Sequence, residues 1–177
     1  MDILATAPTA QPAPTIYACF SQSRGLGDLI RRFTGGDVNH AFLKWLDPTF
    51  GTWLTLGANA NGLTIETLSK FPDKIMHVYE FPSPGLVKGL RAKANLLNSP
   101  YDYAGLIGMS LVEINDHLLE RMVANPTLDY HKLFCSEYVT EVIRASGINI
   151  LPKWLPGSVD PAALCQACAE LAKEVTV

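Results

Sequence analysis

The alternation of apolar and polar residues divides the chain into a strand-rich first half and a helix-rich second half. Short apolar or alternating runs that end at Gly, Pro, Asn or Asp predict strands. Between the third and fourth of these runs, the sequence NANG at 59–62 predicts a hairpin turn, because Asn and Gly tolerate a positive φ. The strands expected from these runs cover residues 15–21, 37–46, 52–58, 63–68 and 74–81.

Apolar residues at helical spacing predict one early helix and a series of later ones. In the clearest of them, residues 135–146, Gly147 follows the last periodic position and suits a C-terminal cap. Asp160 and Pro161 mark the start of the last helix. The other expected helices cover 23–36, 85–98, 101–114 and 116–125. Strands followed by helices predict an α+β fold, an antiparallel sheet packed against helices in a single domain.

Residues 1–14 are rich in Ala, Pro and Thr and predict a flexible arm ahead of a folded domain at 15–177. An arm of this kind can tether the domain to a protein partner. The same stretch lacks the basic region of a signal peptide, so we expect none.

Composition limits the class of protein. The 177 residues are 48% hydrophobic, enough for one core, and the formal net charge is −3. Lys and Arg form no long run, which argues against a nucleic-acid partner. No stretch reaches the roughly 18–20 apolar residues of a membrane span, so we expect no transmembrane segment.

Four cysteines are too few for a disulfide framework at this size. Cys165 and Cys168 form a C-x-x-C within an Ala-rich helical pattern, and no second pair accompanies them. Packing within a helix is therefore favoured over a zinc or redox site, and we expect neither a metal nor a cofactor. Cys19 lies in an apolar strand and is expected in the core.

Cys135 stands at the start of its helix, on the side that also carries Tyr138 and Val139. If that helix packs on the sheet, the sulfur lies at a helix N-terminus, where free N–H groups and the dipole favour an anion. That setting lowers a thiol pKa and provides donors for an oxyanion. A buried cysteine that only fills the core is the competing interpretation.

A nucleophilic thiol needs a base, and the chain has four histidines. His117 has acidic neighbours and is expected in solvent, His131 lies on the approach to the Cys135 helix, and His77 can be a satisfied core residue. His40 is the best candidate, because it shares an apolar strand face with Val38 and Phe42. We expect it to face the helix that carries Cys135 and to accept the thiol proton.

Five segments occur in a recognisable order: LGDLIRRFTGGDVNHAFL, NANGLTIETL, PYDYAGLIG, KLFCSEYVTEVIRASG and PGSVDPAAL. Together they resemble the circularly permuted NlpC-like cysteine hydrolases, a papain-like branch that includes the YiiX-type proteins. In that branch the histidine strand precedes the Cys-Ser-Glu helix, as His40 precedes Cys135 here. The resemblance covers roughly residues 16–165, and its strongest parts are Asn39-His40 and Phe134-Cys135-Ser136-Glu137.

The resemblance implies that Cys135 is the nucleophile and His40 the base, with a third polar group that orients the imidazole. Many relatives carry an acid where this chain has Gly57. A backbone carbonyl or water can orient the ring instead. The resemblance also places Tyr101 and Ser136 near the substrate or the oxyanion, whereas for Asp102, beside Tyr101, capping of the following helix is the favoured role. The side chains that can substitute for the missing acid are Thr55, Asn59 and Asn61.

The function expected from the resemblance is cleavage of an amide bond through an acyl-enzyme, with bacterial cell-wall peptide as substrate. Two alternatives stay open: a structural or binding module that has lost activity, such as a phage virion or tail component, and an enzyme acting on acyl lipids. Without a signal peptide, the expected location is the bacterial cytoplasm or a phage particle.

Overall fold

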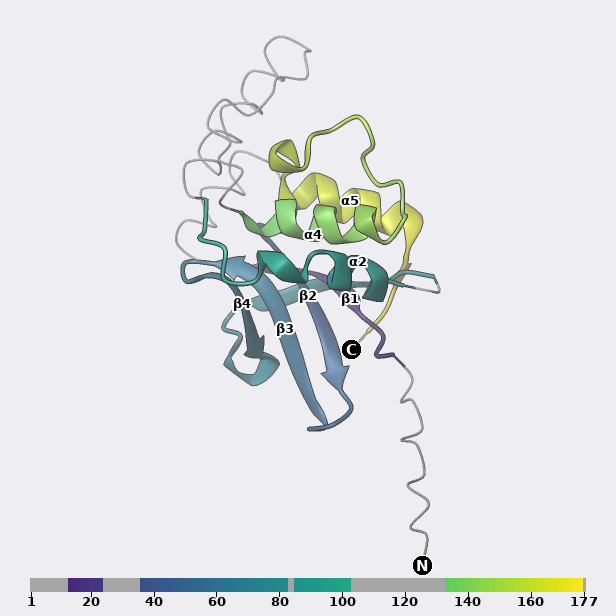
Figure 1. Cartoon of the computed structure of the whole chain (residues 1–177). Coiled ribbons are helices and arrows are strands. Elements are labelled where there is room, and N and C mark those ends of the chain that lie inside the picture. The colour runs from purple at the N-terminus through teal and green to yellow at the C-terminus, as the bar shows by residue number, and fades with distance from the viewer. Residues whose placement is uncertain (1–12, 24–35, 83–84, 103–132, 177) are drawn as a thin grey trace, which may run out of the picture.

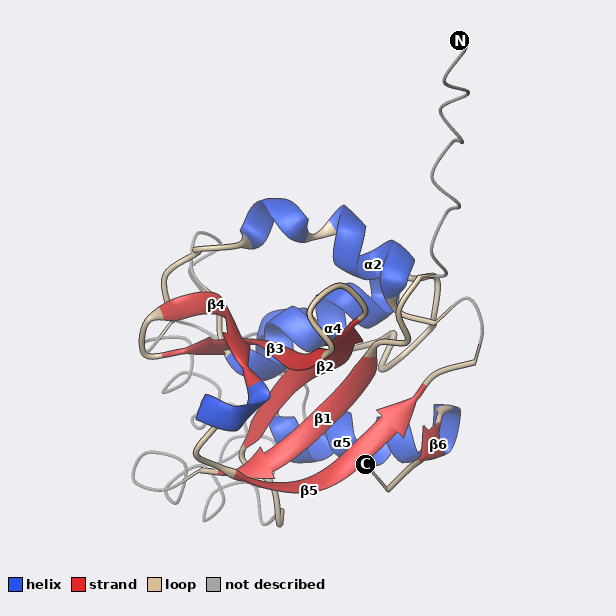
Figure 2. Ribbon diagram, turned by 90° about the horizontal axis from the view of Figure 1, so that it is seen from below, coloured by secondary structure: helices blue, strands red, loops and turns tan. Residues whose placement is uncertain are grey.

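The computed structural model describes residues 13–23, 36–82, 85–102 and 133–176. In this part of the chain a six-stranded antiparallel sheet is covered on one face by helices, so the fold is α+β (Figure 1). Seen from below, the sheet lies in front of helices α4 and α5 (Figure 2). The strands, in the spatial order β4-β3-β2-β1-β5-β6, are β1 Tyr17–Gln22, β2 His40–Asp47, β3 Thr52–Asn59, β4 Gly62–Thr67, β5 Lys74–Glu80 and β6 Lys173–Glu174.

The first five strands confirm the strand predictions, with boundaries that differ by up to three residues. The NANG hairpin is also confirmed, since Asn59 pairs with Gly62 and Gly62 has a φ of +93°. The two-residue strand β6 follows the last helix and pairs with β5, and its residues, Lys173 and Glu174, have no apolar pattern from which a strand could be predicted.

Three α-helices lie in the described residues: α2 Val87–Ala92, α4 Cys135–Ala145 and α5 Pro161–Leu171. The helix expected over 85–98 is shorter than predicted, because the chain leaves helical geometry at Lys93 (φ −107°) and continues into a 3₁₀ turn, η2 Ala94–Leu96. The other 3₁₀ turns are η1 Leu68–Lys70 and η3 Pro156–Ser158. The helices expected at 23–36, 101–114 and 116–125 lie wholly or almost wholly outside the described residues, as do residues 1–12 of the expected arm.

Both predicted cap positions have the expected geometry. After α4, Gly147 has a φ of +91° and donates its N–H to the Arg144 carbonyl, while Ile148 donates to Ile143. These two bonds form a Schellman motif. At the start of α5, the Asp160 carboxylate accepts the N–H groups of the second and third helical residues at 2.7 and 2.9 Å.

Alternate residues of the strands form two separate apolar clusters. The larger cluster joins Leu43 and Ala41 of β2 to Val139 and Val142 of α4, so it lies between the sheet and the helices. The smaller one is built around Cys19, Phe42 and Val78, with Phe71 and Val175 packed against it. The 3₁₀ region after β4 and the C-terminal tail therefore cover part of the second face of the sheet.

Helices α2 and α4 approach each other closely at Gly89. Its N–H donates to Ser146 Oγ at 3.1 Å, and that hydroxyl donates to the Val142 carbonyl at 2.9 Å. A Cβ at Gly89 would overlap the Val142 carbonyl oxygen and lie 2.9 Å from its carbon. Glycine at this position is thus a condition for the contact between the two helices.

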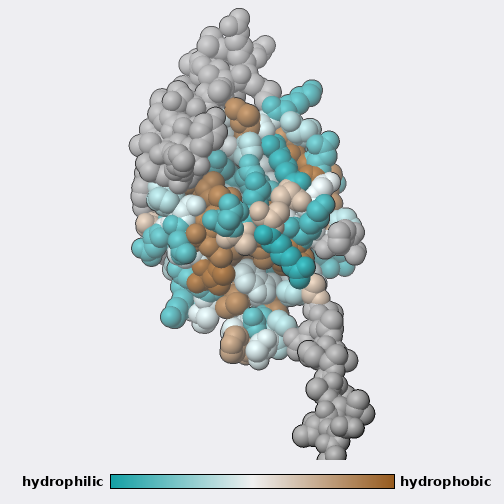
Figure 3. Space-filling view, viewed as in Figure 1, coloured by the Kyte–Doolittle hydropathy of each residue, from teal (hydrophilic) through white to brown (hydrophobic). Residues whose placement is uncertain are grey.

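The surface carries a limited set of large exposed apolar side chains, and apolar residues gather over β3 and β4 in the space-filling view (Figure 3). Phe50, at the turn between β2 and β3, is the most exposed of them at 79%. Among the helices in the described ranges, none combines the length and the apolar character required to cross a membrane.

Candidate functional site

The start of α4 is held in place by a segment far away in the sequence. Tyr101 and Leu133 form a parallel bridge, in which Asp102 donates to the Leu133 carbonyl at 3.1 Å and Leu133 donates to Pro100 at 3.0 Å. Extended backbone at Phe134 (φ −110°, ψ 170°) then leads directly into Cys135 as the first helical residue. The Pro-Tyr-Asp element and the cysteine, separate in the sequence, therefore lie side by side.

The Cys135 sulfur is surrounded by hydrogen-bond donors and closed off from solvent. The residue is 1% exposed. Burial raises the pKa of the thiol to about 11, against an opposing effect of the backbone N–H groups of Ala41, Ser136 and Cys135 itself, which lower it. The helix N-terminus does supply the expected donors, but desolvation outweighs them, and the pKa is raised where the sequence predicted it to be lowered.

His40 is the first residue of β2, adjacent to the Ala41 whose N–H reaches the sulfur. Its ring stacks on Phe42 and Phe71, with centroid separations of 5.9 and 6.0 Å. These rings belong to the smaller apolar cluster. The imidazole therefore does not face the helix that carries Cys135, contrary to the expectation from the sequence. Val38 does lie in the larger, helix-facing cluster. The shared face predicted for Val38 and His40 fails because β2 begins only at His40, after Val38.

Burial lowers the pKa of His40 to about 4, so the imidazole is neutral at pH 7. Within the described residues, no hydrogen bond joins this ring to another side chain or to the sulfur of Cys135. Ala41 lies in the helix-facing cluster, whereas His40 stacks on Phe42 in the smaller cluster. Successive residues of a strand point to opposite faces, so the thiol and the imidazole lie toward different faces of the sheet and are not in contact.

Gly57 lies beside the His40 ring. A Cβ at this position would be 3.6 Å from His40 Nε2 and 3.0 Å from the Cβ of Phe42. Gly57, where the family resemblance leads one to expect an acid, is therefore next to the imidazole, but the ring and Phe42 occupy the space that a side chain would need.

The three side chains considered as substitutes for the acid have contacts within the β3–β4 hairpin. Thr55 donates to the Glu66 carbonyl at 3.3 Å. Asn59 donates to Thr64 Oγ1 at 3.2 Å and, through its Oδ1, accepts the N–H of Asn61 at 2.8 Å. Asn61 is exposed in the turn. These bonds hold the hairpin, and none of them reaches His40.

The two residues expected near the substrate occupy different settings. Tyr101 is half-buried beside Leu133, two residues before Cys135. Ser136 is fully buried, and its hydroxyl donates to the Val159 carbonyl at 2.6 Å. Ser136 is also among the groups that lower the pKa of the Cys135 thiol by hydrogen bonding, through both its backbone and its side chain.

Two buried carboxyl groups lie next to the start of α4. Glu137 is 7% exposed and accepts the Phe134 N–H at 3.4 Å, as a residue of the first helical turn can. Burial, with a smaller contribution from the nearby charge of Asp102, raises the pKa of its carboxyl to about 8, against the opposing effect of the hydrogen bond from the Phe134 N–H. Glu137 therefore carries a proton near neutral pH, which the sequence pattern of a helix start did not indicate.

The other cysteines and histidines lie elsewhere. Cys19, Cys165 and Cys168 are buried and free. The described residues contain no cluster of three or more His, Cys, Asp or Glu arranged to hold a metal ion. His77 contacts two carboxylates from distant segments, a role that sequence analysis missed because both partners come from remote parts of the chain. His117 and His131 lie outside the described residues.

Comparison with known proteins adds no relative to this picture. No family model matches the chain, and no curated protein matches it either.

Proposed function

We propose that this protein is a thiol hydrolase that cleaves an amide bond, with Cys135 as nucleophile and His40 as base, in the circularly permuted NlpC-like variant of the papain-like fold. One observation carries the proposal: at the start of an 11-residue helix, backbone hydrogen bonding at Ala41, Ser136 and Cys135 itself lowers the pKa of the Cys135 thiol, against the effect of burial. Ala41 is the residue next to His40. A nucleophile, a base and oriented donors are the parts that acyl transfer requires, and His40 is adjacent to the site through its backbone only.

Both groups are in the protonation states from which general-base catalysis starts, a protonated thiol and an unprotonated imidazole. Because the pKa of His40 is lowered and that of Cys135 is raised, thiol and imidazole are uncharged at pH 7. The imidazole would take the thiol proton as the sulfur bonds to the substrate carbonyl carbon. This step requires the ring to come within about 3–4 Å of the sulfur, directly or through one water.

The donors around the sulfur have a second use in this mechanism. Once the sulfur is bonded to carbon, the negative charge moves to the former carbonyl oxygen, and N–H groups at the helix start can receive it. Collapse of this intermediate expels the amine, which takes the proton from the imidazolium. Water, deprotonated by His40, then hydrolyses the thioester and regenerates the thiol.

Bacterial cell-wall peptide is the substrate that the family resemblance favours. A protein of this kind would stay in the cytoplasm of the producing cell until it is released, or it would be carried in a phage particle. The N-terminal arm would attach it to a protein partner in the particle. The choice of substrate rests on the resemblance, and the attachment through the arm rests on the composition of residues 1–14.

Digestion of purified peptidoglycan tests the proposal. We expect the wild-type chain to release peptide fragments, and Cys135→Ala and His40→Asn to abolish release with the fold retained. Cys165→Ser is the matched control, because it changes another buried free thiol away from the start of α4. Full activity of a folded Cys135→Ala variant would disprove the assignment of the nucleophile.

A binding module without activity is the second candidate, and two observations favour it. In the described residues the His40 ring has no hydrogen-bond partner, and Gly57 offers no side chain beside it. If the folded wild-type chain sediments with peptidoglycan but cleaves neither peptidoglycan nor acyl-lipid substrates, the binding module is the correct assignment. Cleavage of acyl lipids alone would instead identify a lipid hydrolase.

A further inference from the structure

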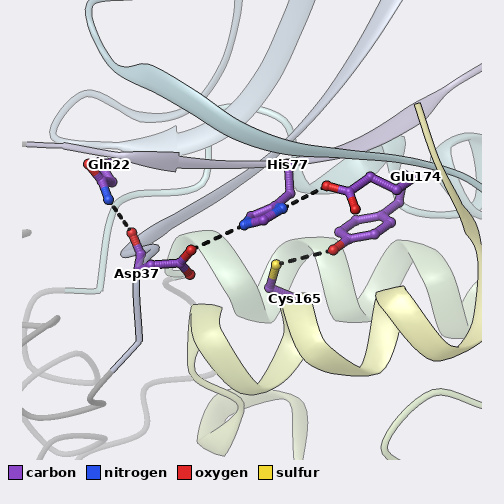
Figure 4. Close-up of polar contacts among 6 residues, drawn as sticks. Gln22, Asp37, His77, Cys165 and Glu174 are labelled. Atoms are coloured by element: carbon purple, nitrogen blue, oxygen red, sulfur yellow. Dashed lines mark hydrogen bonds and ion pairs between the residues drawn. The ribbon is translucent and has the colours of Figure 1, made fainter. Parts of the chain in front are cut away.

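His77 links three segments that are distant in the sequence. Its Nδ1 lies 2.7 Å from Glu174 Oε1 in β6, and its Nε2 lies 3.3 Å from Asp37 Oδ2, in the segment that leads to His40 (Figure 4). Asp37 is also held through its backbone, because Gln22 Nε2 donates to its carbonyl at 2.6 Å. The imidazole thus sits between two carboxylates, one on each side of the ring.

This geometry defines the protonation state of the ring. A carboxylate oxygen only accepts hydrogen bonds, and a neutral imidazole has a single N–H to donate. Both contacts can be satisfied together only by the imidazolium form. Burial alone would lower the pKa of His77, but hydrogen bonds and charge from Glu174 and Asp37 raise it above its usual value.

We propose that His77 is a pH-operated staple, which in its protonated form holds Asp37 and the start of the His40 strand to β5 and the C-terminal strand. On deprotonation the ring keeps one N–H. The shorter contact, to Glu174, retains it, and the Nε2 lone pair then faces the Asp37 carboxylate. The contact between His77 and Asp37 is then lost, and the segment between Asp37 and His40 loses one of its attachments.

The surroundings of His77 contain no other group that titrates in the same range among the described residues. On β5, Tyr79 stacks on the ring at 6.2 Å, and burial raises its pKa far above neutral. On α5, the Cys165 thiol bonds to the Tyr79 hydroxyl, and burial raises its pKa to about 11. Both are uncharged near pH 7, so the charge balance depends on His77 and the two carboxylates.

The staple holds the segment that leads to His40, the proposed base. The inference does not require His40 to act as a base. Asn39, between Asp37 and His40, donates its backbone N–H to the Ser21 carbonyl at 3.1 Å. This bond reports whether the segment is attached to β1. On the Glu174 side, Val175 donates to the Val78 carbonyl at 2.9 Å and reports on the C-terminal strand.

Nuclear magnetic resonance of the full chain over a pH series tests the inference without any enzymatic readout. We expect His77 to titrate above pH 6.5, and Asn39 amide protection to fall by roughly threefold or more through that midpoint, beyond the intrinsic effect of pH on exchange. Val175 protection should change much less. Because these measurements use the unmodified chain, they do not depend on whether a variant folds.

Variants then assign the effect. Asp37→Asn and Glu174→Gln should each lower the pKa of His77 by roughly half a unit or more. In Asp37→Asn the Asn39 protection should no longer depend on His77, because an amide can donate to the neutral ring. Glu80→Gln is the matched control, since Glu80 pairs with β6 without touching His77. A His77 pKa at or below 6.5 in the wild-type chain, or Asn39 protection unaffected by its titration, would overturn the proposal.

Discussion

Cys135 should react slowly with iodoacetamide at neutral pH, although it stands at a helix N-terminus. Alkylation requires the thiolate, and burial raises the pKa of this thiol from 9.0 to about 11. The ionised fraction near pH 7, and with it the rate, is therefore roughly a hundredfold lower than in the unfolded chain. The rate should continue to rise with pH until about pH 11.

The assay is alkylation of the full chain over a pH series, with each cysteine-containing peptide quantified by mass spectrometry. The same chain unfolded in urea provides the reference rate. Cys19 is an internal comparison: it is completely buried, and burial raises its pKa further than that of Cys135, with only Lys44 opposing the shift. Cys135 should thus react faster than Cys19 and more slowly than any thiol of the unfolded chain.

A rate for Cys135 that levels off below pH 9, or that exceeds the unfolded reference near pH 7, would refute this reasoning. Either result would mean that the donors at the helix start outweigh burial. The sulfur would then be a preformed thiolate, and the neutral thiol–imidazole pair of the proposed mechanism would be wrong.

Three further predictions concern the same region. If His40 is the base, kcat/KM should be lost as pH falls through about 4, because the neutral imidazole exists only above its lowered pKa; an acid limb near 6.5 would contradict the burial of the ring. Glu137→Gln should remove part of the pH dependence of stability. The folded chain holds the Glu137 proton between its unfolded pKa of 4.5 and about 8, so wild-type stability falls as pH rises through this window, by about 3 kcal/mol from pH 5 to pH 8. Urea denaturation of both chains at pH 5 and pH 8 measures how much the free energy of unfolding changes between these pH values. An equal change in the wild-type and variant chains would disprove a buried, protonated carboxyl. Gly89→Ala should destabilise the chain by about 3 kcal/mol or more, since the methyl group would overlap the Val142 carbonyl and separate the two helices; an unchanged melting temperature would show that the helices can shift at no cost.

Local features of the fold could be read from the sequence because they depend on neighbouring residues. The strands up to β5, the NANG turn, the Gly147 cap and the Asp160 cap each follow from interactions within a few positions along the chain. The length of α2 was overestimated, because apolar spacing continues through Lys93 while the backbone leaves the helix there. Spacing alone does not record a change in φ.

The candidate site shows the limit of such reasoning. The sequence by itself determined that a cysteine starts α4 and that His40 lies within a strand, and the family resemblance suggested an acid at the position of Gly57. The tertiary structure decided that the Ala41 N–H reaches the sulfur, that the His40 ring stacks on Phe42 and Phe71, and that burial raises one pKa and lowers the other.

His77 makes the same distinction more sharply. Its strand position was evident from the sequence, but its partners are 40 and 97 residues away along the chain. Strand order and the return of the C-terminal tail to β5 bring those carboxylates to the ring. Pairing between distant segments and the desolvation of individual groups arise only when the whole chain packs, and they set the charges on which the chemistry of this protein depends.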